Sequence, residues 1–117
     1  MTTPSPIGTA DDLRALHCAH ATTALDGVEA ARLCALLDGW AIVGGRLERS
    51  FAFADYYETL AFVNALAFIA HGQDHHPELV VGYKTCVVRY DTHSARGLSM
   101  NDFICAARAD ALVAGRA

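Results

Sequence analysis

The sequence predicts one α+β domain in which helices alternate with pairs of antiparallel strands. Apolar residues recur at helical spacing near 28–37, 54–71 and 103–112. Two β-rich stretches lie between the first and second of these helices, and two more lie between the second and third. At 117 residues, of which 53% are hydrophobic, the chain is long enough for one domain and too short for two. Segregated helices and strand pairs of this kind are typical of an antiparallel α+β layer fold.

An N-terminal extension is expected over residues 1–25, with the domain itself over 26–117. Residues 1–9 contain two of the three prolines and predict a partly flexible lead-in. A short helix is expected from Asp11 to about His20, with Thr9 or Asp11 as its cap.

The first half of the domain is predicted to hold a helix and a hairpin. Asp26-Gly27 is expected to break the chain, and the following helix should end near Asp38-Gly39. Short apolar stretches near 40–43 and 46–53 flank Gly44-Gly45, which is a hairpin signal.

The segment 54–71 contains no glycine or proline and is apolar on almost every side. A helix of this kind packs on more than one side, so we expect one face on the sheet and another on a partner subunit. Gly72 should end the helix, and Pro77 should prevent its resumption.

Two further strands and a final helix complete the prediction. The strands are expected at 79–83 and 85–90, with the turn near Gly82 to Lys84. Ser99 stands three residues before Asp102 and ahead of an apolar-periodic run. This pattern resembles a capping box that opens the last helix.

Charge and cysteine content exclude several classes of function. The net charge is −4 and Lys84 is the only lysine, so no clustered positive face for nucleic acid is expected. The four cysteines form no C-x-x-C pair and are expected to be small buried hydrophobic residues rather than a disulfide or zinc framework. They are Cys18, Cys34, Cys86 and Cys105.

A cytoplasmic protein without a membrane span is expected. Met1–Ala10 lacks the basic and apolar regions of a secretory signal. The longest apolar run, 60–70, is well short of the roughly 20 residues that a membrane helix needs.

Histidines gather in one part of the sequence. Four of the six lie between positions 71 and 93, and they are His71, His75, His76 and His93. Histidine exchanges protons near neutral pH because its ordinary pKa is about 6.5. The pair His75-His76 follows a long helix, where side chains held by a rigid element can project into a cleft.

Two other interpretations of the histidines stay open on spacing alone. Adjacent histidines in a turn are often solvated surface residues. His71 and His75 are also four residues apart and could share a metal ion on one helix face. However, no glutamate lies between them as in the H-E-x-x-H motif.

A longer register joins the histidines to other constrained positions. It has the form His71-x3-His75-His76-Pro77-x5-Tyr83-x9-His93-x8-Asp102. This run resembles the signature of the pterin-4a-carbinolamine dehydratases, and the resemblance extends over roughly residues 26–114. The segment 101–108 is similar to the bacterial branch that works beside phenylalanine hydroxylase.

The resemblance implies an enzyme that dehydrates a 4a-hydroxytetrahydropterin after aromatic amino acid hydroxylation. It implies that His75, His76 and His93 are catalytic. The residues implied to bind substrate or support the site are His71, Asp74, Asp102, Tyr83 and Trp40. Two alternatives stay open: Asp102 could serve only the N-terminus of the last helix, and Tyr83 and Trp40 could be buried core aromatics. The pterin is the substrate, so neither a metal nor a cofactor is expected.

The resemblance also implies a fold and an assembly. The family fold is a four-stranded antiparallel sheet with three main helices on one face, in the order α-β-β-α-β-β-α. Its members form dimers and tetramers, so a homodimer or homotetramer is expected, with phenylalanine hydroxylase as a possible partner. The alternative is a non-catalytic interaction or assembly protein on the same fold, such as a transcription cofactor or an assembly factor for the carbon-fixing enzyme.

Overall fold

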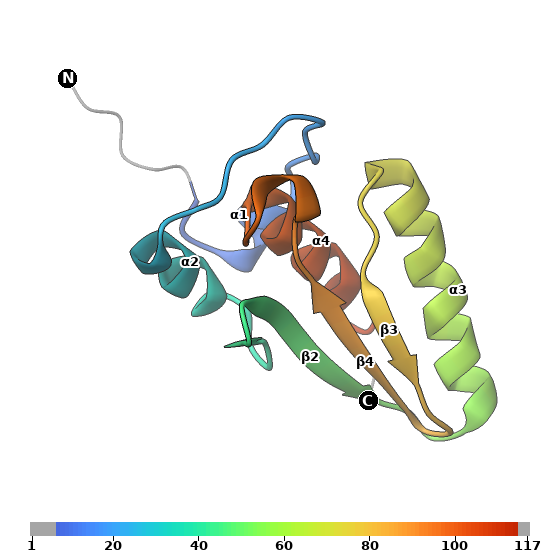
Figure 1. The fold of residues 1–117 in the computed structure, drawn as a ribbon. Helices are drawn as coiled ribbons and strands as arrows, with labels where there is room; N and C mark the ends of the chain where they lie inside the picture. Colours follow the sequence, from blue (N-terminus) through green and yellow to red (C-terminus); the bar gives the residue numbers. More distant parts are fainter. Residues whose placement is uncertain (1–6, 115–117) are drawn as a thin grey trace.

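Four strands form one antiparallel sheet in the order β1-β2-β4-β3 in the computed structural model, which describes residues 7–114 (Figure 1). Strands β2 and β4 form the central pair, with Leu47 opposite Tyr90 and Ala52 opposite Thr85. Strands β1 and β3 lie at the two edges. The strands are β1 (Ala41–Val43), β2 (Arg46–Ala52), β3 (Glu78–Val81) and β4 (Thr85–Tyr90).

Helices pack on one face of this sheet, which confirms the predicted fold class (Figure 1). The three longest helices occupy the predicted places in the chain order, and a short helix precedes them. The helices are α1 (Ala10–Arg14), α2 (Gly27–Cys34), α3 (Tyr56–Gln73) and α4 (Met100–Ala111), with a 3-10 turn η1 (His93–Ala95) before α4.

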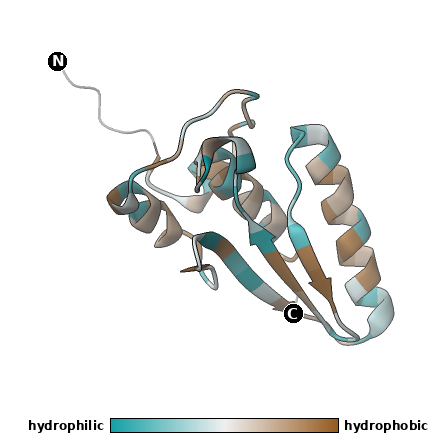
Figure 2. Ribbon diagram, in the orientation of Figure 1, coloured by the Kyte–Doolittle hydropathy of each residue, from teal (hydrophilic) through white to brown (hydrophobic). Residues whose placement is uncertain are grey.

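Alternate residues of the two central strands form the sheet side of the core. Leu47 and Phe51 on β2, and Val88 and Tyr90 on β4, are all at most 3% exposed. Since side chains alternate between the faces of a strand, their neighbours in sequence lie on the opposite face of the sheet. Helix α3 packs its buried residues on this layer, and Phe62 lies 4.6 Å from Phe51 between ring centroids. Figure 2 shows hydrophobic residues along β3 and in the middle of α3.

The N-terminal helix is shorter than the sequence predicted. Thr9 caps it as expected, because its side chain accepts a hydrogen bond from the backbone of Asp12. It ends at Arg14, whereas the prediction extended it to about His20. The chain beyond it is held by side chains of α4 instead, since Asn101 bonds both the backbone N–H and C=O of Ala19. These tertiary contacts replace the bonds that further helix would have made.

Asp26-Gly27 begins a helix and does not break the chain. The Asp26 side chain accepts a bond from Glu29 N at 2.8 Å, which makes it the N-cap of α2. The helix ends at Cys34, before the predicted limit near Asp38-Gly39. Leu36 and Leu37 bond to carbonyls three residues back, so the last turn tightens and the apolar spacing continues through turns.

The sequence predicted that Gly72 would end α3, and this prediction is wrong. The helix continues to Gln73, and Asp74 ends it with φ 52° and ψ 43°. Glycine is tolerated inside a helix at a cost of about 1 kcal/mol. Aspartate visits the left-handed region more easily than most residues, because its short polar side chain can form local hydrogen bonds.

Part of the predicted N-terminal extension belongs to the packed structure. Leu13 on α1 is fully buried in the core, and α1 packs against α4. The partly flexible lead-in was predicted over residues 1–9, of which 1–6 lie outside the described residues.

Candidate active site

The end of α3 places His75 and His76 at the edge of the sheet. Asp74 reverses the backbone, and His75 N donates to the carbonyl of Ala70, which ties the turn to the last turn of the helix. Pro77 then leads the chain into β3. His93 comes from a different place, the 3-10 turn that follows β4.

The three histidines predicted to be catalytic line one hollow. Its volume is about 440 Å³, which falls in the range of small-molecule sites. The hollow is lined by His75, His76 and His93 together with Asp74, Asp91, Thr92 and Ser94. Each of these side chains carries a polar group and three of them are imidazoles, so proton transfer to a bound molecule is chemically available there.

Asp102 fixes the orientation of the His75 ring through a hydrogen bond. Nε2 of His75 donates to Oδ1 of Asp102 at 2.7 Å, and the Asp102 side chain is fully buried. The other carboxylate oxygen, Oδ2, accepts bonds from the Thr92 hydroxyl at 2.8 Å and from Ser99 N at 2.9 Å. Ser99 and Asp102 form the predicted capping box of α4, so the same carboxylate both opens the helix and orients the imidazole.

The environment of His75 raises its pKa. Burial lowers the pKa of this imidazole, but the hydrogen bond and the negative charge of Asp102 outweigh that effect. The ring also stacks on Tyr90, with centroids 5.9 Å apart and planes 11° from parallel. His75 is therefore fixed in orientation and inclined to hold a proton.

A second, more apolar hollow is also lined by His75 and His76. It has a volume of about 390 Å³, and His71 lines it. The remaining lining residues are Leu66, Ala67, Ala70, Asp74, Pro77 and Leu79. His71 and His93 thus line different hollows that share the histidine pair.

Trp40 and Tyr83 are not brought to these hollows. Trp40 is 6% exposed in the core, where its Nε1 donates to Asp110 at 2.9 Å. Tyr83 is 68% exposed in the β3–β4 turn and stacks on Tyr56 in the first turn of α3. The histidine pair follows the last turn of that 18-residue helix, about 27 Å from its beginning.

The sequence did not identify several residues of the site. The ring of Tyr90 stacks on His75, and the Thr92 hydroxyl donates a hydrogen bond to Asp102. Asp91 lines the hollow. The alternation of Cys86, Val88 and Tyr90 along β4 could have placed Tyr90 on the buried face. No sequence signal marks Thr92 as a partner of Asp102.

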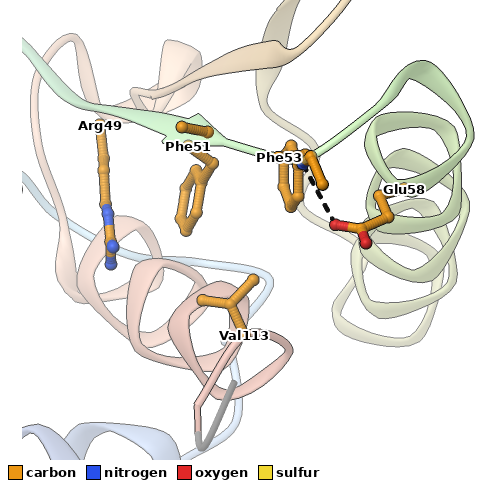
Figure 3. Close-up of a pocket in the computed structure, with 7 residues that line it drawn as sticks. Arg49, Phe51, Phe53, Glu58 and Val113 are labelled. Atoms are coloured by element: carbon orange, nitrogen blue, oxygen red, sulfur yellow. Dashed lines mark hydrogen bonds between the residues drawn. The ribbon is translucent and has the colours of Figure 1, made fainter. Parts of the chain in front are cut away.

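A further hollow, near the N-terminal end of α3, has fewer side chains that could act as acids or bases (Figure 3). Its volume is about 470 Å³, and its charged side chains form hydrogen bonds or ion pairs within the fold. Arg49 pairs with Asp110 at 2.6 Å, and Glu58 accepts a bond from Ala54 N at the start of α3. The lining of this hollow contains no histidine.

Residues 7–114 contain neither a clustered metal-binding site nor a membrane-spanning helix. No cluster of three or more His, Cys, Asp or Glu side chains in that range is arranged to hold a metal ion. No helix in the same range is long and apolar enough to cross a membrane.

Comparisons with known proteins agree on one family. The model of the pterin 4 alpha carbinolamine dehydratase family matches residues 23–112. A Nitrosospira multiformis protein named as a pterin-4-alpha-carbinolamine dehydratase is 47% identical over 107 residues, which cover 89% of this chain and 95% of that protein. A Bdellovibrio bacteriovorus protein of the same name is 54% identical over 93 residues, which cover 76% of this chain and 78% of the relative.

A solved structure has the same fold. The crystal structure of a transcriptional coactivator/pterin dehydratase from Brucella melitensis matches with a TM-score of 0.75 and 32% identity. The match covers 77% of this chain and 98% of the Brucella chain.

Proposed function

The chain belongs to the pterin 4 alpha carbinolamine dehydratase family, and we infer from this membership which reaction its histidine hollow performs. The protein is a hydro-lyase that converts a 4a-hydroxytetrahydropterin into a quinonoid dihydropterin and water. This reaction recycles the tetrahydropterin after aromatic amino acid hydroxylation. The alternative of a non-catalytic interaction protein is not better supported.

The observation that carries the mechanism is the meeting of His75, His76 and His93 in one hollow. Dehydration delivers one proton to the departing 4a-hydroxyl and removes another from a ring nitrogen. Two positioned acid–base groups are enough for this, and each typically contributes 10²–10⁴-fold. His75 and His93 are proposed as the proton-transfer pair, and His76 as a hydrogen-bonding contact to the pterin. The chemistry needs no metal or redox cofactor.

Asp102 is proposed to position His75. Because Nε2 of His75 is held by Asp102, Nδ1 is the nitrogen that can exchange a proton with the substrate. The carboxylate also stabilises the imidazolium that forms when His75 takes up a proton.

His71 and Asp74 are proposed as supporting residues next to the histidine pair. His71 lines the apolar hollow beside His75 and His76. Asp74 lines both hollows, and its charge lies next to the histidine pair.

A homodimer or homotetramer is proposed on the basis of α3. Large apolar side chains on its outer side are exposed to solvent, and Tyr57 and Phe68 are each 80% exposed. Burial of exposed aromatic side chains is a strong driving force for association. Gel filtration of the purified chain tests this, because a clean monomer of 12.5 kDa would contradict it.

The cellular context is part of the same proposal. A cytoplasmic location and a phenylalanine hydroxylase partner would put the dehydratase where its substrate is produced. Co-purification of the hydroxylase with the tagged chain would test the partnership.

The test of function follows the ultraviolet spectrum of a chemically generated 4a-hydroxytetrahydropterin with and without the protein. The wild-type protein should accelerate its decay, and a His75→Ala/His93→Ala double variant should lose the acceleration. His17→Ala is the matched control, since that imidazole is exposed, does not line the histidine hollow, and contacts Gln73 and Arg108 instead of the site residues. A wild-type protein without effect, or a double variant as fast as wild type, would contradict the proposal.

A further inference from the structure

We propose that Cys18 and Cys105 form a reversible intramolecular disulfide, and that the pair is an oxidation site for small disulfides such as glutathione disulfide. All four cysteines are free thiols in the structure. Cys18 and Cys105 differ from the other two because their sulfur atoms meet across the fold. The proposal does not depend on the dehydratase assignment.

The geometry of the pair is close to that of a bond. The two Sγ atoms lie 3.4 Å apart, although the residues are separated by 87 positions in the sequence. A disulfide requires about 2.05 Å, so the sulfurs need to approach by only about 1.4 Å. Cys105 is fixed on α4, whereas Cys18 lies in irregular chain after α1 and can make most of this movement.

Several bonds hold the segment 16–20 against α4 in the reduced state. Asn101 bonds both backbone groups of Ala19, at 3.0 and 2.8 Å. Arg108 donates to the carbonyl of Leu16 at 2.7 Å. Cys18 N donates to the Gln73 side chain at 2.8 Å, which ties the same segment to the end of α3. The two thiols therefore stay together without a covalent link.

Cys18 is the thiol that an external disulfide can reach. It is partly exposed and lines a small hollow of about 130 Å³ together with His17, His20 and Gln73. Cys105 is fully buried.

The environments of the two thiols, Cys18 and Cys105, also differ in charge. A hydrogen bond from Cys105 and the nearby His75 and Arg108 lower the pKa of Cys18 despite its burial. The hydrogen bond and burial raise the pKa of Cys105.

These differences assign the order of the exchange. The Cys18 thiolate attacks one sulfur of glutathione disulfide and releases a glutathione thiolate, which leaves a mixed disulfide on Cys18. The Cys105 sulfur, on losing its proton, attacks the Cys18 sulfur and releases the second glutathione thiolate. The two protons of the protein thiols end on the two glutathione molecules. The protein loses two electrons and the glutathione disulfide gains them.

The disulfide would connect α4, which carries Asp102, to the segment bonded to the end of α3, which leads into His75. Cys105 stands three residues after Asp102 on α4, and the Cys18 backbone is bonded to Gln73, two residues before His75. A cross-link between residues 87 positions apart closes a long loop and restricts the unfolded chain strongly. We expect the oxidised form to melt about 10 °C higher than the reduced form.

The experiment incubates the full chain with glutathione disulfide at pH 7.5, blocks the remaining thiols and measures the intact mass and the non-reduced peptide map. The expected result is one internal cross-link between the Cys18 and Cys105 peptides, two blocked thiols, and full reversal by dithiothreitol. Thermal melting of the oxidised and reduced forms then gives the shift.

Cys34→Ser is the matched control, because it removes another partly buried thiol and should leave the cross-link intact. Cys18→Ser should abolish both the cross-link and the rise in melting temperature. Four blockable thiols after oxidation would overturn the proposal. A glutathione adduct that persists on Cys18, or cross-links only between chains, would overturn it as well.

Discussion

Asp102 and His75 lie 27 positions apart in the sequence and meet at 2.7 Å between a carboxylate oxygen and Nε2 of the imidazole. One carboxylate thereby serves the N-terminus of α4 and the orientation of a histidine in the candidate active site. The same side chain therefore carries the helix cap and the proposed positioning of His75, which are compatible with each other.

Asp102→Asn should separate these two roles. The amide keeps the size and one oxygen acceptor but loses the negative charge that stabilises protonated His75. We expect kcat for carbinolamine dehydration to fall by about 100-fold or more, with a smaller change in KM. The pKa of His75 should also fall, because the substitution removes the charge of Asp102 and weakens its hydrogen bond, the two largest contributions that raise this pKa. The kcat–pH profile measures both effects, and an unchanged kcat would remove Asp102 from the mechanism.

The stability of the protein should depend on pH through His75. Its pKa in the folded state is raised above the unfolded value of about 6.5. The folded state therefore binds more protons in this window, and stability falls as pH rises. The contribution is complete below the unfolded pKa and is lost as pH rises through the folded pKa.

Urea unfolding of wild type and His75→Gln between pH 5.5 and 8.5 tests this dependence. The difference in unfolding free energy between the two proteins should shrink as pH rises. A constant or growing difference would show that the pairing with Asp102 does not favour the charged imidazole.

Gly72→Ala should stabilise the protein. Gly72 lies inside α3, and a Cβ added there meets no atom within 4 Å. Alanine favours the helix over glycine by about 0.5–1 kcal/mol, which should raise Tm by about 4 °C. Differential scanning calorimetry measures the change.

Gly39→Ala is the contrasting variant for that experiment. Gly39 has φ 85°, and an added Cβ would lie 3.0 Å from the Arg49 side chain. This substitution should lower Tm. If both variants moved Tm in the same direction, the helical placement of Gly72 would not explain its effect.

Trp40→Phe should lower stability without changing the active site. The substitution removes the indole N–H that donates to Asp110 and leaves this half-buried carboxylate with Arg49. The loss should be about 1–3 kcal/mol in the unfolding free energy, measured by urea denaturation. Because Trp40 does not line the histidine hollows, KM should match wild type. A raised KM with unchanged stability would instead favour the predicted role of Trp40 in substrate binding.

The fold could be predicted from local patterns because each pattern had a local physical cause. Alternating apolar residues made β2 and β4, Gly44-Gly45 made the first hairpin, and the Ser99 and Asp102 side chains capped α4. Element ends were predicted less well. Gly72 was expected to end α3, but a glycine inside a helix costs only about 1 kcal/mol, and Asp74 in the left-handed region ended it.

The sequence by itself determined the α+β class, the order of the elements and the register from His71 to Asp102 that carries the family resemblance. These are properties of residue type and spacing along the chain. The tertiary structure alone decided that Tyr83 and Trp40 stand away from the histidines, that Tyr90 lies beneath His75, and that Cys18 meets Cys105. Such pairings join positions far apart in the chain, and they arise only when helices and sheet pack into one core.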